Sequence, residues 1–162
     1  MDSPLADLRL RLETLEAESA IRRLLARYMD LCDVPREMTS ASELAELFTE
    51  NAIWEGVGSH YAQKFGRQQG RAEVAAFVAA YLPPSPHFAV NLHLLTSESI
   101  RVAGEEASGQ WIMQQISTYG DRRSELISAR LNIDFRRVAG SWQMAHFRTC
   151  RMFSAALGEA CR

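Results

Sequence analysis

The sequence predicts an α+β fold in which helices come first and a curved antiparallel sheet follows. Three observations lead to this prediction. Apolar residues recur every three or four positions over residues 4–32, which is typical of an amphipathic helix. Residues 70–82 carry another helical pattern that a proline-rich run ends, and from Phe88 onward apolar and polar residues alternate as in strands. Helices packed on the concave face of a strongly curved sheet leave a conical pocket, which is the default place for a ligand.

The first helix is the longest element that the sequence predicts. Its apolar stripe consists of Leu8, Leu12, Leu15, Ile21, Leu24, Leu25, Tyr28 and Leu31. Glutamate and arginine fill the other face of the helix. We expect the helix to end before Pro35, because a proline disfavours helical geometry in the residue that precedes it.

Shorter elements are expected between this helix and the sheet. Ser40 or Ser42 can cap a short helix within residues 42–50. Residues 52–57 have the composition of a strand, and residues 58–70 are typical of a long polar loop.

Four long strands joined by short turns are expected in the second half of the chain. They cover residues 88–102, 106–119, 124–138 and 141–153. In the third of them, alternate residues from Ile127 to Phe135 are apolar and the residues between them are polar. One face of the sheet is therefore expected to be buried and the other solvated. No repeat or linker divides the sequence, so we expect residues 1–162 to form a single domain.

The composition is that of a globular protein without an excess of basic residues for binding a charged partner. Hydrophobic residues make up 47% of the chain and the net charge is −2, so no basic field is available to bind nucleic acid. No apolar run approaches the roughly 20 residues of a membrane span, and no signal peptide is apparent. Cys32, Cys150 and Cys161 are far apart, which argues against a disulfide framework or a structural zinc site. These features predict a cytoplasmic protein.

His93 is the histidine whose surroundings suggest chemistry. It lies within the apolar run VNLHLLT, in a strand whose neighbours call for burial. A buried imidazole needs a partner for its ring N–H, and a carboxylate is the best partner available. A carboxylate on one ring nitrogen would make the other nitrogen a general base. The alternative is a core histidine whose N–H is satisfied by a backbone carbonyl.

Asp33 is the carboxylate that the sequence offers to His93. It follows the buried stripe of the first helix, where solvation does not explain an acidic residue; the alternative is a turn residue that accepts local backbone N–H groups before Pro35. Tyr28 lies on the same stripe and could donate to a substrate oxygen or leaving group, or be a core residue with a solvated tip. Trp54 and Trp111 offer flat apolar walls for a ligand, or are simply part of the core.

Six segments of the chain, in order, resemble a known superfamily. They are IRRLLARYMDLCD, ELAELFTENAIWEG, GRAEVAAF, HLLTSESI, ASGQWIMQ and GSWQMAHF. Together they resemble the SnoaL-like branch of the nuclear transport factor 2-like superfamily, whose members are cone-shaped α+β folds. Within that branch the chain is most similar to scytalone dehydratase, lindane dehydrochlorinase and bile acid 7α-dehydratase, which use an Asp–His pair to remove a proton and expel a leaving group.

The resemblance implies roles for residues of this chain. The family aspartate corresponds to Asp33 and the family histidine, which opens an H-x-x-T motif, to His93. The tyrosine of the bile acid enzyme corresponds to Tyr28. Its late arginine corresponds to Arg151, or to Arg148 if a bulge shifts the strand face.

Two departures from the family pattern bear on the acid half of the reaction. Gln115 stands where the bile acid enzyme has a second pocket aspartate, and the second histidine of scytalone dehydratase has no counterpart. The acid role therefore falls to Tyr28, or Asn132, Gln115 and Arg151 serve only to bind the substrate.

These observations predict a cofactor-independent lyase or isomerase that acts on a hydrophobic, cyclic or aromatic small molecule. No metal is expected, because zinc catalysis usually takes three protein ligands and the pair supplies only two. The alternative is a non-catalytic small-molecule-binding module, or a structural β subunit of a ring-hydroxylating dioxygenase. The resemblance also implies a homo-oligomer formed through the outer face of the sheet, with a trimer ahead of a dimer.

Overall fold

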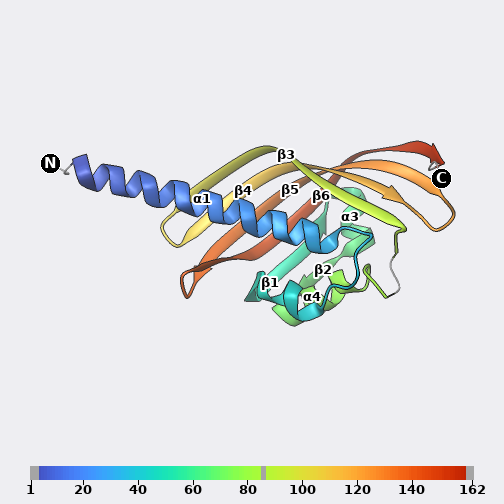
Figure 1. Ribbon diagram of the computed structural model, residues 1–162, viewed down its shortest axis with the longest axis horizontal. Helices are drawn as coiled ribbons and strands as arrows, with labels where there is room; N and C mark the ends of the chain where they lie inside the picture. Colours follow the sequence, from blue (N-terminus) through green and yellow to red (C-terminus); the bar gives the residue numbers. More distant parts are fainter. Residues whose placement is uncertain (1–3, 85–86, 160–162) are drawn as a thin grey trace.

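The computed structural model describes residues 4–84 and 87–159, and Figure 1 shows a long helix lying across a curved sheet. The helices are α1 (Pro4–Cys32), α2 (Ala41–Glu46), α3 (Gly58–Phe65) and α4 (Arg71–Ala79). The strands are β1 (Phe48–Val57), β2 (Arg67–Gln69), β3 (Val90–Ala103), β4 (Glu106–Thr118), β5 (Arg123–Val138) and β6 (Ser141–Glu159). The predicted α+β fold, with helices followed by four long strands, is confirmed.

The sheet is mixed rather than purely antiparallel, which corrects the prediction. Its strand order is β2-β1-β6-β5-β4-β3, and the pairing of β1 with β6 is parallel while the other neighbours pair antiparallel. The cause is the path of the chain. After β1 it passes through α3, β2 and α4 before the meander of β3 to β6 begins, and the last strand of the meander returns beside β1 in the same direction.

The second half of α1 covers the concave face of the sheet. Ile21 and Leu25 are fully buried there, and Tyr28 is nearly so. Side chains of β5 that alternate along the strand meet them from the sheet, including Leu131 and Ile133, which leave at most 1% of their surface exposed. This is the period-two burial that the sequence predicts for one face of the sheet.

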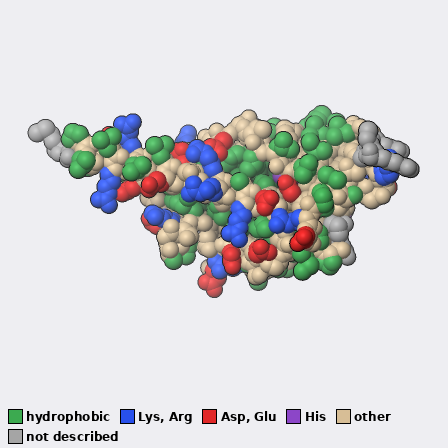
Figure 2. Space-filling model, viewed as in Figure 1, with side chains coloured by type: hydrophobic (Ala, Val, Ile, Leu, Met, Phe, Trp, Pro, Cys, Tyr) green, Lys and Arg blue, Asp and Glu red, His purple; other side chains and the backbone are tan. Residues whose placement is uncertain are grey.

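The first half of α1 extends beyond the edge of the sheet (Figure 1). The prediction of a single apolar stripe is therefore wrong: its first three leucines lie roughly opposite the side of α1 that buries Ile21 and Leu25. Leu8, Leu12 and Leu15 are 57%, 56% and 61% exposed, although they follow the same three- and four-residue spacing as the buried part. Figure 2 shows green apolar side chains on this projecting segment, between charged ones.

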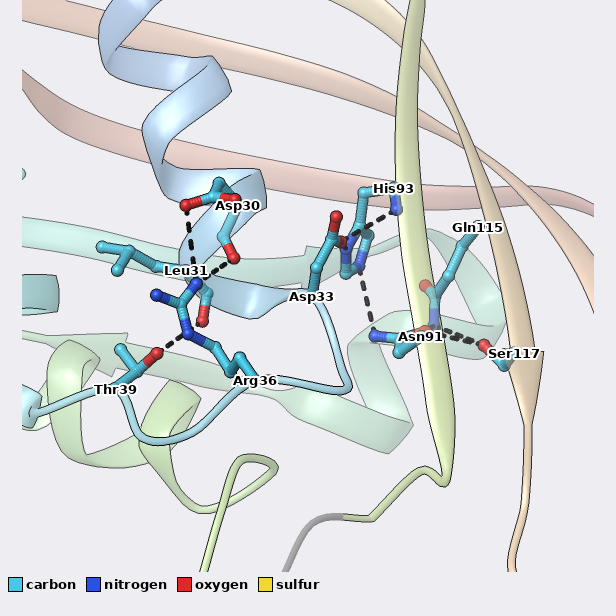
Figure 3. Close-up of polar contacts among 9 residues, drawn as sticks. All are labelled: Asp30, Leu31, Asp33, Arg36, Thr39, Asn91, His93, Gln115 and Ser117. Carbon is cyan, nitrogen blue, oxygen red and sulfur yellow. Dashed lines mark hydrogen bonds and ion pairs between the residues drawn. The ribbon is translucent and has the colours of Figure 1, made fainter.

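The segment after α1 is tied down by several hydrogen bonds. Arg36 donates to the backbone carbonyl of Asp30, and the hydroxyl of Thr39 donates to the carbonyl of Leu31 at 3.0 Å (Figure 3). These bonds satisfy carbonyls of the last helical turn, which have no partner within the helix. Val34 then forms a two-way backbone bridge with Asn91 of β3, each N–H lying 2.9 Å from the other carbonyl oxygen. The residue between helix and bridge, Asp33, is thereby fixed beside β3.

The segment predicted as a polar loop over residues 58–70 instead contains α3 and β2. Tyr61 and Phe65, four residues apart, pack against each other on one side of α3, with ring centroids 4.7 Å apart. Gly56 of β1 allows the backbone of α3 to lie close to the strand, because a Cβ atom there would lie 2.2 Å from the carbonyl oxygen of Tyr61. The expected cap of the second helix is Ser40, which forms a reciprocal capping box with Glu43.

Two further observations concern the predicted class of protein. No helix within residues 4–84 and 87–159 is long and apolar enough to span a membrane. Cys32 and Cys150 are free thiols, while Cys161 lies outside the described residues.

Candidate functional site

A cavity of about 130 Å³ lies between the end of α1, the helices α3 and α4, and the concave face of the sheet. Most of the side chains around it are apolar or aromatic. Apart from the tyrosines, its polar side chains come from several different elements: Lys64, His87, Asn91, His93, Gln115 and Thr149. An apolar cavity with a small number of placed polar groups is the usual form of a small-molecule site.

His93 lines this cavity and is in contact with Asp33, which lies behind it and does not line the cavity. The Nδ1 atom of His93 lies 2.7 Å from Oδ1 of Asp33, and the same oxygen accepts the backbone N–H of His93 at 3.0 Å. The histidine side chain is 10% exposed and the aspartate side chain 31% exposed. The two residues are thus in direct contact, although they are 60 positions apart in the sequence.

The local fold explains why these two residues come together. Strand alternation places His93 on the concave side of β3, opposite Gln115 of β4. The backbone bridge between Val34 and Asn91 aligns the segment after α1 with β3, so Asp33 lies level with His93. One carboxylate oxygen then accepts from both the ring and the backbone of the same residue, which fixes the imidazole in position and orientation.

A chain of side-chain amides and a hydroxyl lies on the other side of the imidazole (Figure 3). Ser117 donates to Oδ1 of Asn91 at 2.8 Å, and Nε2 of Gln115 donates to the same oxygen at 2.9 Å. Asn91 and Ser117 are 4% and 0% exposed. With its oxygen held by two donors, Asn91 turns its Nδ2 amine toward Nε2 of His93, at 3.5 Å.

The partners of the ring assign its tautomer. Asp33 is an acceptor and faces Nδ1, so Nδ1 carries the hydrogen. The amine of Asn91 is a donor and faces Nε2, so Nε2 presents its lone pair. The arrangement therefore leaves a basic nitrogen on the imidazole, which is the form that a proton acceptor needs.

Tyr28 lies on the cavity wall within the aromatic core. Its oxygen accepts the indole N–H of Trp54 at 3.1 Å. Burial raises the pKa of the Tyr28 phenol well above its ordinary value of 10.0, and the same cause raises the pKa of the neighbouring Cys32 thiol to about 12. Both groups therefore keep their protons at neutral pH, and the phenol can act as a hydrogen-bond donor.

Aromatic rings form a large part of the remaining cavity wall. Trp54 stacks on Phe147 with the ring planes 6° apart and the centroids at 5.5 Å, and Phe77 and Phe65 pack against the same indole. His87 and Tyr119 extend the lining, with centroids 5.8 Å apart. Neither His87 nor Tyr119 was predicted from the sequence to line a site. Their signal is weak, because His87 follows a proline-rich run and Tyr119 stands at the end of a strand.

The other predicted binding residues divide between the cavity and the rest of the sheet. Trp54 and Gln115 line the cavity. Trp111 lies in the core, where its ring covers Gly109 so closely that a Cβ atom there would lie 2.2 Å from it, and its N–H donates to Glu98 at 3.2 Å. Trp111 is thus placed as a core residue and does not line the cavity.

The structure does not bring Asn132 or Arg148 to the cavity. Both alternate with buried residues, so their side chains leave the sheet on its outer face. Asn132 accepts from Gln110 at 2.8 Å, while Arg148 forms an ion pair with Asp134 at 2.6 Å.

Arg151 lies close to the cavity without lining it. Its positive charge acts to lower the pKa of Tyr61, although burial dominates and raises that pKa to about 12. Among the residues that the structure describes, no group of three or more His, Cys, Asp or Glu side chains is arranged to hold a metal ion.

Comparisons with known proteins bear on the family of this chain. No curated protein matches the sequence. The hexachlorocyclohexane dehydrochlorinase LinA type 2 is similar in structure, with a TM-score of 0.74 and 18% identity over 91% of this chain and 93% of that protein. A candidate scytalone dehydratase from Novosphingobium aromaticivorans gives a TM-score of 0.71 and 19% identity, over 91% of each chain.

Other findings agree with this likeness. An NTF2-like protein with a cystatin-like fold from Novosphingobium aromaticivorans is 25% identical, with a TM-score of 0.59 over 94% of this chain and 92% of that protein. The fold that the sequence resemblance implied is therefore confirmed. The SnoaL-like domain family itself matches residues 13–148, which include both Asp33 and His93. The chain belongs to the SnoaL-like domain family.

Proposed function

We propose that this protein is a cofactor-independent lyase or isomerase that uses His93 as a general base on a hydrophobic, cyclic or aromatic small molecule. The observation that carries the proposal is the contact of 2.7 Å between Nδ1 of His93 and Asp33 at the wall of an aromatic cavity. The geometry leaves Nε2 as the proton-accepting atom. The similarity of the fold to a dehydrochlorinase and a candidate dehydratase supports the same class.

The proposed reaction begins with proton abstraction. Nε2 of His93 takes a proton from a carbon next to an activating group, and the electrons of that C–H bond form a new double bond. In a lyase reaction the bond to a leaving group, water or halide, breaks at the same time or afterwards. In an isomerase reaction the proton returns at another carbon. General-base catalysis of this kind contributes about 10²- to 10⁴-fold.

Asp33 has two tasks in this proposal. Before reaction it holds the hydrogen on Nδ1, so that Nε2 keeps its lone pair. In the resting site that lone pair faces the Asn91 amide at 3.5 Å, and in the proposed reaction the substrate proton takes the place of this long contact. During reaction its negative charge stabilises the imidazolium that forms. The second hydrogen bond, from the backbone N–H of His93 to the same oxygen, keeps the carboxylate in place through both states.

Asn91 is the positioning residue of the resting site, and Tyr28 is the proposed donor. The amide NH2 group of Asn91 faces Nε2 and so favours the tautomer that carries its hydrogen on Nδ1. Tyr28 donates to a substrate oxygen or assists departure of the leaving group, since its raised pKa keeps it protonated. Trp54 and Phe147 supply a flat apolar surface that suits a ring.

The test compares the wild-type protein with His93→Gln on cyclic and aromatic ketones that carry a hydroxyl or chloride at the β carbon. Glutamine fills a similar volume but accepts no proton at neutral pH. We expect turnover to fall at least about 100-fold while the dissociation constant for an unreactive analogue changes less than about threefold. Equal turnover in both proteins would contradict the proposal.

The same experiment separates the alternative of a non-catalytic binding module. A module would bind ring compounds through the aromatic wall, with no turnover by either protein. A structural subunit of a ring-hydroxylating dioxygenase would in addition be recovered only in complex with a larger Rieske-type subunit.

A further inference from the structure

The projecting half of α1 carries a row of leucines on one side of the helix. We define this leucine seam as Leu5, Leu8, Leu12 and Leu15, whose exposed fractions are 77%, 57%, 56% and 61%. Their spacing of three, four and three residues is the a and d spacing of a heptad repeat, which in coiled coils forms the contact between two helices. The described part of α1 before Ala17 runs for about 20 Å at 1.5 Å per residue.

The leucine seam points away from the sheet of its own chain. At about 100° per residue, the seam lies roughly opposite the face of α1 that buries Ile21, Leu25 and Tyr28. The fold of one chain therefore cannot cover the seam, even where α1 passes over the sheet. Leu10, which is 63% exposed, lies on the same side of α1 as Ile21 and Leu25 and is not part of the seam.

We propose that the leucine seam is an interface at which α1 pairs with α1 of a second copy of this chain, parallel and in register. In this arrangement each seam leucine meets its own counterpart. Because the seam faces away from the sheet, the two globular bodies lie on the outer sides of the helix pair. This interface differs from the outer sheet face, which the family resemblance suggests for oligomerisation.

The charges beside the seam select this pairing. With Leu12 at position a, Arg11 is at g and Glu16 at the e position that a parallel partner would place opposite it. Within its own helix Arg11 reaches Asp7 only at 3.9 Å. The antiparallel register that also pairs every leucine would place Arg11 against the partner's Arg11, which is unfavourable.

The charge balance also favours a second copy over a membrane surface. Asp7, Glu13 and Glu16 flank the seam together with Arg9 and Arg11, so the segment is not the basic helix that binds anionic lipid. The family match begins at residue 13, so Leu5, Leu8 and Leu12 precede the family domain. Two heptads are fewer than the three or four of an independent coiled coil, so in this proposal the seam acts together with a second interface between copies, such as the outer sheet face that the family resemblance suggests.

The test measures the molar mass of the intact protein by sedimentation equilibrium. We expect Leu8→Glu/Leu12→Glu to have half the mass of the wild type, and the matched control Leu10→Glu to keep the wild-type mass. Circular dichroism and the thermal midpoint confirm that each variant is folded. An equal mass for the wild type and Leu8→Glu/Leu12→Glu would overturn the proposal. If the wild type in addition bound anionic vesicles, the seam would be a membrane contact instead.

A charge exchange tests the parallel orientation. Arg11→Glu places like charges opposite each other at two symmetric positions, and we expect it to weaken pairing about tenfold. The double variant Arg11→Glu/Glu16→Arg exchanges the signs and should restore the wild-type dissociation constant. A double variant as weak as Arg11→Glu alone would overturn the parallel register.

Discussion

Oδ1 of Asp33 accepts two hydrogen bonds from the same residue, one from the Nδ1 atom of His93 at 2.7 Å and one from its backbone N–H at 3.0 Å. A single bond to the ring would leave the imidazole free to swing about it. The second bond fixes the carboxylate to the strand, so ring and carboxylate form one rigid unit. The geometry is that of a base and its orienting acid.

Asp33→Asn tests this unit. The amide keeps the size of the side chain but loses the charge that stabilises an imidazolium. Its NH2 group can also donate to Nδ1, which favours the tautomer with hydrogen on Nε2. We expect kcat to fall about 10²- to 10⁴-fold with little change in ligand affinity. Glu37→Gln, an exposed carboxylate in the same loop, is the control and should keep wild-type kcat. Equal kcat for Asp33→Asn and wild type would exclude the orienting role.

Asn91→Asp tests the positioning role of the amide. The change replaces a donor 3.5 Å from Nε2 of His93 with a carboxylate, which favours the imidazolium. The proposed mechanism requires the neutral imidazole, so the acid limb of the pH–rate profile of this variant should move to higher pH by about one unit or more. Asn132→Asp on the outer face of the sheet is the matched control and should leave the limb in place. An acid limb that does not move in Asn91→Asp would refute the assignment.

Tyr28→Phe tests the proposed donor. Loss of the hydroxyl should lower kcat by about 10²-fold or more if the phenol assists the leaving group. It also leaves the indole N–H of Trp54 without its acceptor, which costs about 1–3 kcal/mol of folding free energy. Trp54→Phe removes the same hydrogen bond but keeps the phenol. Because Trp54 also lines the cavity, the two variants are compared by kcat at saturating substrate and by their free energies of unfolding. Equal losses of kcat and of unfolding free energy in both would argue that the hydroxyl is structural.

The buried Cys32 thiol predicts how stability depends on alkaline pH. Burial raises its pKa from 9.0 to about 12, so the unfolded chain loses this proton at lower pH than the folded protein does. Its contribution to stability is therefore complete below pH 9 and is lost between pH 9 and 12, at up to about 1.4 kcal/mol per pH unit. Urea denaturation at a series of pH values should show that the free energy of unfolding falls less steeply between pH 9 and 12 in Cys32→Ser than in the wild type. The same slope in both proteins would contradict the prediction.

The sequence was informative about the parts of the fold that have strong periodicity. The alternation from Ile127 to Phe135 predicts the buried face of β5, and the helical stripe predicts α1. The parallel pairing of β1 and β6 could not be predicted, because it depends on where the meander ends in space rather than on local pattern. The helix α3 was missed, because its apolar residues Tyr61 and Phe65 are few and embedded in a polar segment.

The candidate site shows the same limit. Strand alternation predicts the face of β3 that carries His93, because a period of two needs no knowledge of distant residues, whereas Gln115 was named from the family resemblance alone. The roles of Asn91 and Ser117 depend on the register between β3 and β4, which brings them opposite each other. The choice between Arg148 and Arg151 depends on bulges along β6, which a sequence pattern does not locate.

The tautomer of His93 tests the central claim most directly, and it needs no substrate. A long-range ¹H–¹⁵N correlation spectrum of the protein at pH 8, assigned with His93→Gln, reports which ring nitrogen carries the hydrogen. We predict hydrogen on Nδ1 and a bare Nε2, with a shift toward the other tautomer in Asp33→Asn. A wild-type spectrum with hydrogen on Nε2 and a bare Nδ1 would contradict the assignment of His93 as an Asp33-oriented base.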